Sequence, residues 1–329
     1  MNRIPHIAVI GAGIAGLSCA VVLQKAGLKT SLFDKSGGPS GRMSTRCGDS
    51  WQCDHGAQYF TARHPDFRAE VARWRQKGVA GLWTPKLQVL GEQPLPDSDQ
   101  ALERFVGIPR MTSPAHFLCE ALALTPHTTI QQIQRQIDGW HLFSAEHGWL
   151  DSCFDGVVLA VPAPQAVILM QPVAPALAEV AGSAVMRGCW ALMLRFASAL
   201  ELPFDAAFVN RGPLRWVARD SSKPGRGETE TWVLHASADW SEAHLESDID
   251  WVAAALLQAF VQLGAPQPPA WTLHRWRFAD TERPLNKGCV WQSASGLGLC
   301  GDWLNDGTVQ GAWLSGRQLA QQVLHLHNG

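Results

Sequence analysis

The sequence predicts an α/β fold in which a Rossmann-like domain is joined to a second, mixed α+β domain. Three observations support this fold class. The chain has 329 residues, enough for about two domains at roughly 150 residues each. A strand, a glycine-rich turn, a helix and a second strand follow one another within residues 6–34, and a short apolar strand followed by a long helix lies within residues 298–327. Hydrophobic residues make up 46% of the chain, so both domains can have an apolar core.

The N-terminal motif is typical of a phosphate-binding turn. His6–Ile10 is an apolar run suited to a strand buried on both faces, and Gly11–Gly16 follow it with glycine at the first, third and sixth positions. The first glycine permits a tight turn, the second lets a pyrophosphate approach the backbone, and the third lets helix and strand pack closely. A helix to about Ala26 and a strand over 28–33 come next. That strand ends at Asp34, where a carboxylate can accept hydrogen bonds from a ribose diol.

The next two segments indicate which dinucleotide is bound. The fingerprint alone does not separate NAD from FAD, and a glycine-rich turn that binds nothing is the alternative to both. Ser36–Thr45 is a loop containing Gly41-Arg42, and residues 54–60 read Asp-His-Gly-Ala-Gln-Tyr-Phe. With these segments the sequence resembles the FAD-dependent amine oxidase superfamily, whose members carry G-G-R-x-x-[ST] after the second strand. Ser40 stands in place of the first glycine, and we expect it to leave the turn undisturbed.

The C-terminal region resembles the same superfamily. Gly298–Asp302 is a short apolar strand that ends in Gly-Asp, and a helix is predicted over 309–327. The resemblance implies that Asp302 binds the ribityl or pyrophosphate part of FAD and that Arg42 lies along the pyrophosphate or the flavin edge. It also implies that the helix N-terminus points at the flavin pyrimidine, where it stabilises negative charge on the reduced ring. A core helix with a packing glycine is the alternative, but superfamily segments at both ends of one chain argue against coincidence.

The resemblance also implies a division into two domains. One is an FAD-binding Rossmann-like domain of the glutathione reductase / amine oxidase type, and the other is a mixed α+β substrate domain. We expect the FAD-binding domain to consist of residues 1–64, 111–163 and 271–329, and the substrate domain of residues 65–110 and 164–270. Within the first, we expect a helix over 114–124, antiparallel strands over 130–150 and a buried strand over 154–162.

Shorter strings narrow the resemblance. His274–Ala279 contains the Trp-x-[Tyr/Phe]-Ala sequence that precedes the last FAD segment, and Lys223–Arg226 reads Lys-Pro-Gly-Arg. With residues 54–60 and Gly301-Asp302, these strings resemble the bacterial renalases over essentially the whole length. Members of that family oxidise 2- and 6-dihydro isomers of NAD(P)H to NAD(P)+ and pass the electrons to O2 as hydrogen peroxide. The resemblance therefore implies an FAD-dependent oxidase whose partners are a small dihydronicotinamide and O2.

The alternative is an FAD-dependent amine oxidase acting on a small amine. Such enzymes commonly frame the substrate between two tyrosines that face the flavin, whereas this chain has one tyrosine, Tyr59. A dihydropyridine regains an aromatic ring when it loses hydride, so positioning over flavin N5 suffices and no general base is needed. A non-catalytic flavin sensor is a third possibility, but no signalling module is evident. Non-covalent FAD is expected, because Cys300 lies within a strand and not in a recognisable attachment motif.

The expected site lies where the two domains meet, in front of the flavin ring. We expect Gln58 and His235 to be catalytic and no metal to be bound. The candidate lining residues are His55, Gln58, Trp216, Trp232, His235, His274 and Trp276, although Trp and His in apolar strands more often belong to a core. The residues expected to bind FAD are Gly11, Gly13, Ile14, Ala15, Gly16, Asp34, Lys35, Gly41, Arg42, Met43, His55, Gly56, Ala57, Gln58, Asp302, Val309, Gly311 and Ala312.

Composition argues against several other classes of function. Lys+Arg 27 against Asp+Glu 29 gives a net charge of −2, without the clustered positive charge that nucleic acid binding requires. The eight cysteines include no C-x-x-C pair, which favours a reducing cytoplasm over a disulfide framework or a zinc site. The uncharged stretch Ile7–Leu23 has regularly spaced glycines and no export-type cleavage site. We therefore expect a cytoplasmic protein without a membrane segment, in an oligomeric state that the sequence does not indicate.

Overall fold

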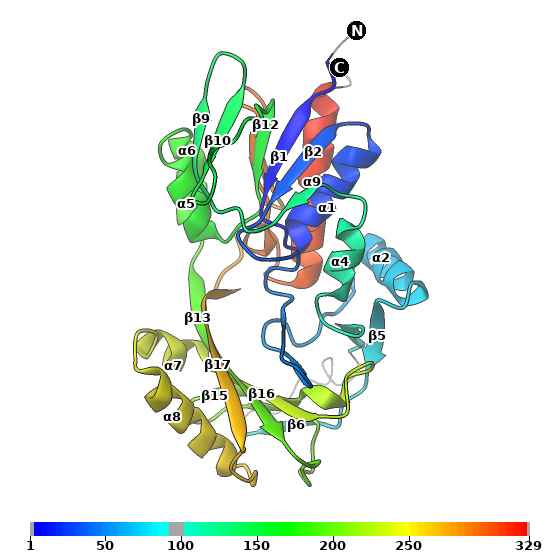
Figure 1. Ribbon diagram of the computed structural model, residues 1–329, viewed down its shortest axis with the longest axis vertical. Helices are drawn as coiled ribbons and strands as arrows, with labels where there is room; N and C mark the ends of the chain where they lie inside the picture. Colours follow the sequence, from blue (N-terminus) through cyan, green and yellow to red (C-terminus); the bar gives the residue numbers. More distant parts are fainter. Residues whose placement is uncertain (1–2, 92–101, 328–329) are drawn as a thin grey trace.

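Two six-stranded β-sheets organise the chain (Figure 1). The structure is a computed structural model that describes residues 3–91 and 102–327. Within those residues, no helix is both long and apolar enough to cross a membrane.

The first sheet has the strand order β18-β19-β12-β1-β2-β8 and is parallel except for β18. Its strands are β1 (His6–Ile10), β2 (Lys29–Phe33), β8 (Leu124–Thr125), β12 (Gly156–Leu159), β18 (Val290–Gln292) and β19 (Leu297–Leu299). Every residue of β1 is buried, as expected for a strand covered on both faces. Ile7 and Val9 pack towards α1 (Ile14–Lys25) and α9 (Val309–His327), and Ala8 and Ile10 belong to a second apolar cluster on the opposite face.

The second sheet has the order β17-β13-β16-β15-β14-β6 and lies below the first in Figure 1. Its strands are β6 (Leu87–Leu90), β13 (Met186–Phe196), β14 (Ala206–Val209), β15 (Leu214–Arg219), β16 (Glu230–Ala236) and β17 (Ala270–Thr281). One face packs against α8 (Ile249–Val261), next to α7 (Ala238–Ala243). Residues of the other face, including Met193 and Val233, join the apolar cluster that contains α1 and α9. We call the part of the molecule built around the first sheet the first half and the part built around the second sheet the second half. One face of the second sheet therefore points towards the first half.

Smaller elements complete the two halves. The remaining strands are β3 (Thr45–Cys47), β4 (Gln52–Asp54), β5 (Ala80–Trp83), β7 (Arg104–Gly107), β9 (Ile130–Arg135), β10 (Trp140–Ser144) and β11 (Gly148–Trp149). Among the residues that the structure describes, the remaining helices are α2 (Pro65–Gln76), α4 (Ser113–Cys119), α5 (Ala163–Met170), α6 (Pro175–Gly182), and the 3-10 turns η1 (Asp220–Ser222) and η2 (Asp302–Leu304).

Most expected elements are present, with one clear correction. The structure confirms the strand, helix and strand of the N-terminal motif, the antiparallel strands after residue 130, and the helix over 309–327. The expected helix over 114–124 was wrong at its C-terminal end, because α4 stops at Cys119. Leu124 and Thr125 instead pair with Leu32 and Phe33, which satisfies backbone groups at the edge of the first sheet. The expected domain boundaries stay a prediction, and β17, which begins at residue 270, pairs with β13 in the second sheet.

Candidate functional site

The glycine-rich turn between β1 and α1 has the shape of a phosphate cradle. Gly11 has a φ of +102°, and a Cβ added there would lie 2.5 Å from the carbonyl oxygen of Ala160. A Cβ added at Gly16 would lie 2.0 Å from the carbonyl oxygen of Gly11. At Gly13, by contrast, the nearest atom to an added Cβ is the Cα of Gly41 at 4.0 Å. The first and last glycines are therefore required by close packing, and the middle one leaves open space that a bound group can fill.

The start of α1 supplies donors to that space. Gly13 is the N-cap and contributes no side-chain hydrogen bond, so the first backbone N–H groups, on Ile14, Ala15 and Gly16, have no side-chain cap. Such N–H groups and the helix dipole favour an anion. Asp34 is fixed beside the turn, because its carboxylate accepts hydrogen bonds from the backbone N–H of Ala12 at 2.7 Å and of Ser36 at 2.8 Å.

The carboxylate of Asp34 keeps further acceptor capacity for a ribose diol. The exposed Lys35 follows it. The open cradle, the uncapped helix and this acid together fit the phosphate and ribose groups of FAD.

The segments around Gly41 and Asp302 meet at the same place. A Cβ added at Gly41 would lie 3.3 Å from the Cα of Gly13, and the buried Met43 follows shortly after it. Arg42 forms a two-point ion pair with Asp302, in which one contact is 2.9 Å long, and it also donates to the carbonyl oxygen of Ala279 at 3.1 Å. The two residues expected at the cofactor from opposite ends of the chain are thus bonded to each other.

Residues 55–57 run beside residues 42–44. The N–H of Ala57 donates to the carbonyl oxygen of Arg42 at 2.9 Å, and that of His55 donates to Ser44 at 3.2 Å. A Cβ added at Gly56 would lie 2.0 Å from the carbonyl oxygen of Arg42. The close approach of these two segments therefore requires glycine at position 56.

The N-terminus of α9 is capped from within the chain. The Oγ1 of Thr308 accepts a hydrogen bond from the N–H of Gly311 at 3.0 Å, and Ala312 donates to the carbonyl oxygen of Thr308 at 2.9 Å. The carboxylate of Asp306 accepts from both the N–H and the hydroxyl of Thr308. The expected stabilisation of negative charge by the helix starting at Val309 is therefore opposed by a carboxylate already at that end.

The second sheet presents a row of rings to this half of the molecule. Its register places Phe208 beside Trp216, Trp216 beside His235, His235 beside Ala191, and Ala191 beside His274. Directly paired residues lie on one face of a sheet, so Phe208, Trp216, His235 and His274 form one row across five strands. Ala191 is the small residue between the two histidines.

His55, which belongs to the first half, contacts the end of this row. Its ring is 4.7 Å from the ring of His274 and is stacked on Trp276, with centroids 5.2 Å apart and 20° between planes. Its carbonyl oxygen accepts hydrogen bonds from Trp276 Nε1 at 2.9 Å and from His235 Nε2 at 3.1 Å. We call His55, His235, His274 and Trp276 the imidazole cluster.

The imidazole cluster is held uncharged. Burial, together with the nearby His274 and Arg46, lowers the pKa of His55 to about 3. Burial and Arg215 lower the pKa of His235 to about 4, and burial and Arg46 lower that of His274 to about 4. In the described part of the chain, the buried His55 Nδ1 has no hydrogen-bond partner. A buried polar atom without a partner is costly, so the cluster fits a molecule that would supply one.

Two other candidate residues have different roles in the structure. Trp232 was wrongly expected to line the site, because it lies three residues from His235 in β16 and therefore faces the opposite side of the sheet. There it is fully buried, against Phe204 and Phe260. The Nε2 of Gln58 donates to the carbonyl oxygens of Asp54 and Gly56, at 2.7 and 3.1 Å, so its side chain braces the segment that carries His55. Its expected catalytic role stays a prediction.

Sequence reasoning missed a buried group of four charges beside this segment. Lys223 Nζ lies 3.0 Å from Asp54 and 2.7 Å from Asp220, and it also donates to Gln58 at 3.3 Å. Arg226 pairs with Asp54 at 2.5 Å, and its Nε lies 3.5 Å from Asp220. We call Asp54, Asp220, Lys223 and Arg226 the buried quartet. Two of its members, Lys223 and Arg226, belong to the Lys-Pro-Gly-Arg string noted in the sequence. The residues that neighbour them in the sequence do not indicate that they are buried.

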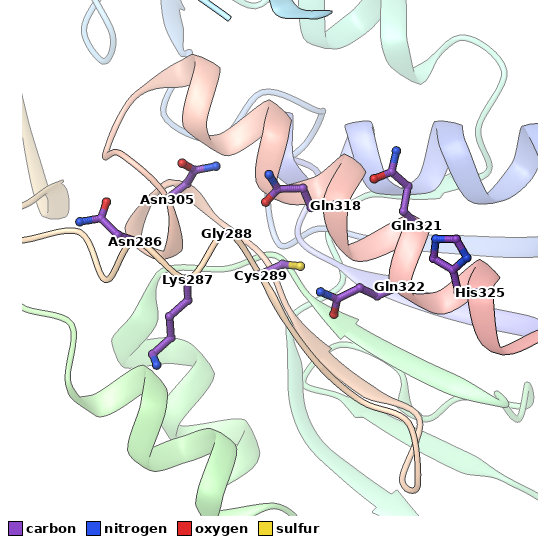
Figure 2. Close-up of a pocket in the computed structure, with 9 residues that line it drawn as sticks. All are labelled: Asn286, Lys287, Gly288, Cys289, Asn305, Gln318, Gln321, Gln322 and His325. Atoms are coloured by element: carbon purple, nitrogen blue, oxygen red, sulfur yellow. The ribbon is translucent and has the colours of Figure 1, made fainter.

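A separate pocket of about 570 Å³ lies between α9 and the segment that precedes β18. Figure 2 shows side chains of α9 facing the segment that precedes β18. Most of its lining residues have polar side chains, and they are Asn286, Lys287, Gly288, Cys289, Asn305, Gln318, Gln321, Gln322 and His325. None of the residues expected to bind cofactor or substrate lines it.

Comparisons with known proteins agree with this architecture. Residues 9–74 match the family described as NAD(P)-binding Rossmann-like domain. A bifunctional protein of tRNA 5-methylaminomethyl-2-thiouridine biosynthesis, MnmC, from Magnetococcus marinus is 30% identical over 207 residues, which are 49% of this chain and 30% of that protein. The chain spans less than a third of the length of the curated relatives it matches.

Solved structures match over nearly the whole chain. A putative protoporphyrinogen oxidase from Exiguobacterium matches with a TM-score of 0.78 and 13% identity, covering 98% of this chain and 99% of that one. Cyclohexylamine oxidase from Brevibacterium oxydans matches with a TM-score of 0.77 and 12% identity, covering 99% and 100%. Likeness at this identity shows the fold, and it confirms the fold class expected from the sequence.

Proposed function

We propose that this chain, which has the fold of the FAD-dependent amine oxidase superfamily, is an oxidase of the renalase type. It would bind FAD non-covalently and transfer hydride to flavin N5 from the 2- or 6-dihydro isomers of NAD(P)H. O2 would be the electron acceptor, and the products would be NAD(P)+ and hydrogen peroxide. The proposal rests on the resemblance of the sequence and on the chemistry of the imidazole cluster.

The chain's own residues fit the cofactor. The turn from Gly11 to Gly16 and the start of α1 would hold the pyrophosphate, and Asp34 would hold a ribose. When bound, FAD supplies the acceptor for a hydride and returns the two electrons to O2. Residues 41–43 and 55–57, which lie side by side, would border the flavin, with Asp302 fixed by Arg42.

The low pKa values of the imidazole cluster carry the choice of substrate. An effective general base has a pKa near the working pH, and His55, His235 and His274 have pKa values of about 3, 4 and 4. They are weak bases at neutral pH, and an amine that arrives as an ammonium ion must lose a proton before it is oxidised. A dihydropyridine needs no such proton transfer. A site without a strong base therefore favours the dihydropyridine.

The same rings suit a flat, neutral substrate. His55 and Trp276 are aromatic rings stacked on each other, and neutral imidazoles can both donate and accept hydrogen bonds, as a carboxamide substituent requires. The single tyrosine, Tyr59, packs against Trp216 at 5.8 Å with Arg104 over its ring at 5.3 Å. A pair of tyrosines framing a small amine is therefore impossible in this chain.

Anaerobic mixing tests the proposal. Purified protein should be yellow, should release FAD on heating, and should bleach rapidly with the 2- or 6-dihydro isomers. Ordinary 1,4-NAD(P)H and amines such as putrescine and cyclohexylamine should bleach it slowly or not at all. Rapid bleaching by an amine alone would favour the amine oxidase alternative. Colourless protein that cannot be reconstituted with FAD would contradict both.

His235 offers a matched test within the cluster. His235→Gln keeps a hydrogen-bond donor that can reach the carbonyl oxygen of His55, whereas His235→Leu removes it and leaves that carbonyl without one of its two partners. We expect the Leu variant to bleach with the isomers at least tenfold more slowly than the Gln variant. Equal rates for the two variants would show that this hydrogen bond has no part in the reaction.

A further inference from the structure

Two arginines lower the pKa of a histidine in the imidazole cluster, and one of them is neutralised. Arg215, which lies next to Trp216 in β15, is paired with Asp280 at 2.5 Å. Arg46 forms no ion pair within the described part of the chain.

The position of Arg46 is fixed by the first half of the molecule. It lies in the middle of β3, which pairs with β4 so that Arg46 stands opposite Cys53, two residues before His55. Its NH2 group donates to Nδ1 of His274 at 3.2 Å. Because a guanidinium only donates, His274 must carry its proton on Nε2, which agrees with a neutral ring. The side chain thus reaches from the first half to the edge of the imidazole cluster.

Most of the binding capacity of Arg46 is unused. A guanidinium has five N–H donors, and one of them has a partner among the described residues. The residue is exposed, so an approaching molecule can reach the others. Its charge extends into the cluster, because it lowers the pKa of both His55 and His274.

We propose that Arg46 binds a phosphate group of the substrate and thereby selects a dinucleotide over an amine. This inference rests on the proposed function. The neutral rings would take the neutral nicotinamide, and the unpaired guanidinium at their edge would take the anionic part by the two-point contact that arginine forms with phosphate. The same charge repels an ammonium ion, so Arg46 acts both for one substrate class and against the other.

The alternative is a solvated arginine that only positions His274. The two roles differ in what they do to a substrate that lacks phosphate. A positioning role would alter the binding of every substrate through His274, whereas a phosphate contact would alter the binding of phosphorylated molecules alone.

The experiment compares two substrates and three variants of the holoenzyme. Dissociation constants are measured by rapid mixing for the dihydro isomers of NAD and of nicotinamide riboside, which lacks phosphate. We expect Arg46→Gln to weaken binding of the dinucleotide about tenfold or more, the usual effect of losing a hydrogen bond between charged groups. Arg46→Gln should change riboside binding less than twofold, and Arg46→Lys should fall between Gln and the native residue. Arg135→Gln is the control, because it removes an exposed charge on β9, away from the imidazole cluster. It should change the binding of neither the dinucleotide nor the riboside.

A second readout keeps this inference separate from the proposed function. Oxidised NAD+ is titrated into the oxidised holoenzyme, and binding is followed by the change in flavin absorbance, which requires no turnover. Tighter binding to the native protein than to Arg46→Gln, with the difference shrinking as salt rises, supports the contact even if no isomer is oxidised. Equal losses for dinucleotide and riboside, or NAD+ binding that is the same in both proteins or absent from the native one, would overturn it.

Discussion

Ser40 allows the expected turn, but its backbone conformation is strained. Serine in place of the first glycine of the Gly-Gly-Arg motif was expected to leave the turn undisturbed. The chain does make the turn: the N–H of Ser40 donates to Ala12 at 3.0 Å, and its carbonyl accepts from Met43 at 3.1 Å. However, Ser40 has a φ of +150°, a conformation that favours glycine. The surrounding hydrogen bonds therefore hold serine in a strained backbone.

We predict that Ser40→Gly stabilises the protein. Relief of backbone strain is worth roughly 1–3 kcal/mol, and the extra entropy of an unfolded glycine offsets roughly 0.5–1 kcal/mol of it. The free energy of unfolding should thus rise by about 1 kcal/mol, measured by chemical denaturation. Ser36→Gly is the control, because Ser36 has no positive φ and glycine there should give no gain. The same change in both variants would rule out strain at Ser40.

At the level of elements, the contact between α1 and α9 joins the two ends of the chain. The hydroxyl of Ser18 donates to the carbonyl oxygen of Trp313 at 2.8 Å. A Cβ added at Gly316 would lie 2.0 Å from the carbonyl oxygen of Ala15. The backbones of the two helices therefore touch directly at the first turn of α1, which belongs to the phosphate cradle.

Gly316→Ala should separate these helices. Its new methyl group would meet backbone, which cannot move without shifting α1, so we expect the free energy of unfolding to fall by about 2 kcal/mol or more and FAD to be released more readily. Gly182→Ala in α6 is the matched control, since its added Cβ would meet nothing closer than Val167 Cγ2 at 3.8 Å. Flavin fluorescence during thermal unfolding reports both effects. If the two variants retain FAD equally well, the close contact does not support the cradle.

The elements that sequence predicted are those that depend on local pattern. Regularly spaced glycines, an acid after the second strand and a long amphipathic stretch determine β1, α1, β2 and the helix over 309–327. The end of α4 was wrong because Leu124 finds a partner in β2, which is remote in sequence. The row from Phe208 to His274 depends on the register of five strands. The sequence indicated several of these residues as candidates, but it could not predict that they lie side by side. Trp232 was misplaced for that reason.

The whole molecule is tied together by the buried quartet. Asp54 belongs to β4 in the first half, whereas Asp220, Lys223 and Arg226 follow β15 in the second. All four side chains are almost fully buried, and the two positive and two negative charges balance. Removing one member leaves an uncompensated buried charge, which typically costs about 3–5 kcal/mol. Balanced charge is therefore a condition of the contact between the halves, and no local pattern in the sequence predicts it.

The two acids of the quartet respond to pH in opposite directions. Although burial opposes ionisation, the attraction of Lys223 and Arg226 lowers the pKa of Asp54 to about 2. Burial and repulsion by Asp54 outweigh the attraction of the cations at Asp220 and raise its pKa to about 6. Because its pKa is lowered, Asp54 stabilises the fold at pH values above 3.8, the reference pKa of the carboxyl. That contribution to stability is lost as pH falls below 3.8 towards 2. A raised pKa stabilises the fold at low pH, and that contribution is lost as pH rises towards 6.

Between pH 4 and pH 7, Asp220 should therefore be the acid of the quartet that titrates. Its pKa is about 6 in the fold against a reference value of 3.8, and a difference of that size corresponds to roughly 3 kcal/mol at about 1.4 kcal/mol per unit. We predict that the free energy of unfolding of Asp220→Asn, minus that of the native protein, increases by about 2 kcal/mol from pH 4 to pH 7, because the unfolded carboxyl is already more than half ionised at pH 4. Asp151→Asn, which removes an exposed carboxylate, should show no such increase. Denaturant unfolding at each pH measures the two differences. If the difference in free energy of unfolding between Asp220→Asn and the native protein stays constant or shrinks as pH rises, the prediction is contradicted. Lys223 and Arg226 would then hold Asp220 ionised throughout. The buried quartet would join the two halves equally well at every pH in this range.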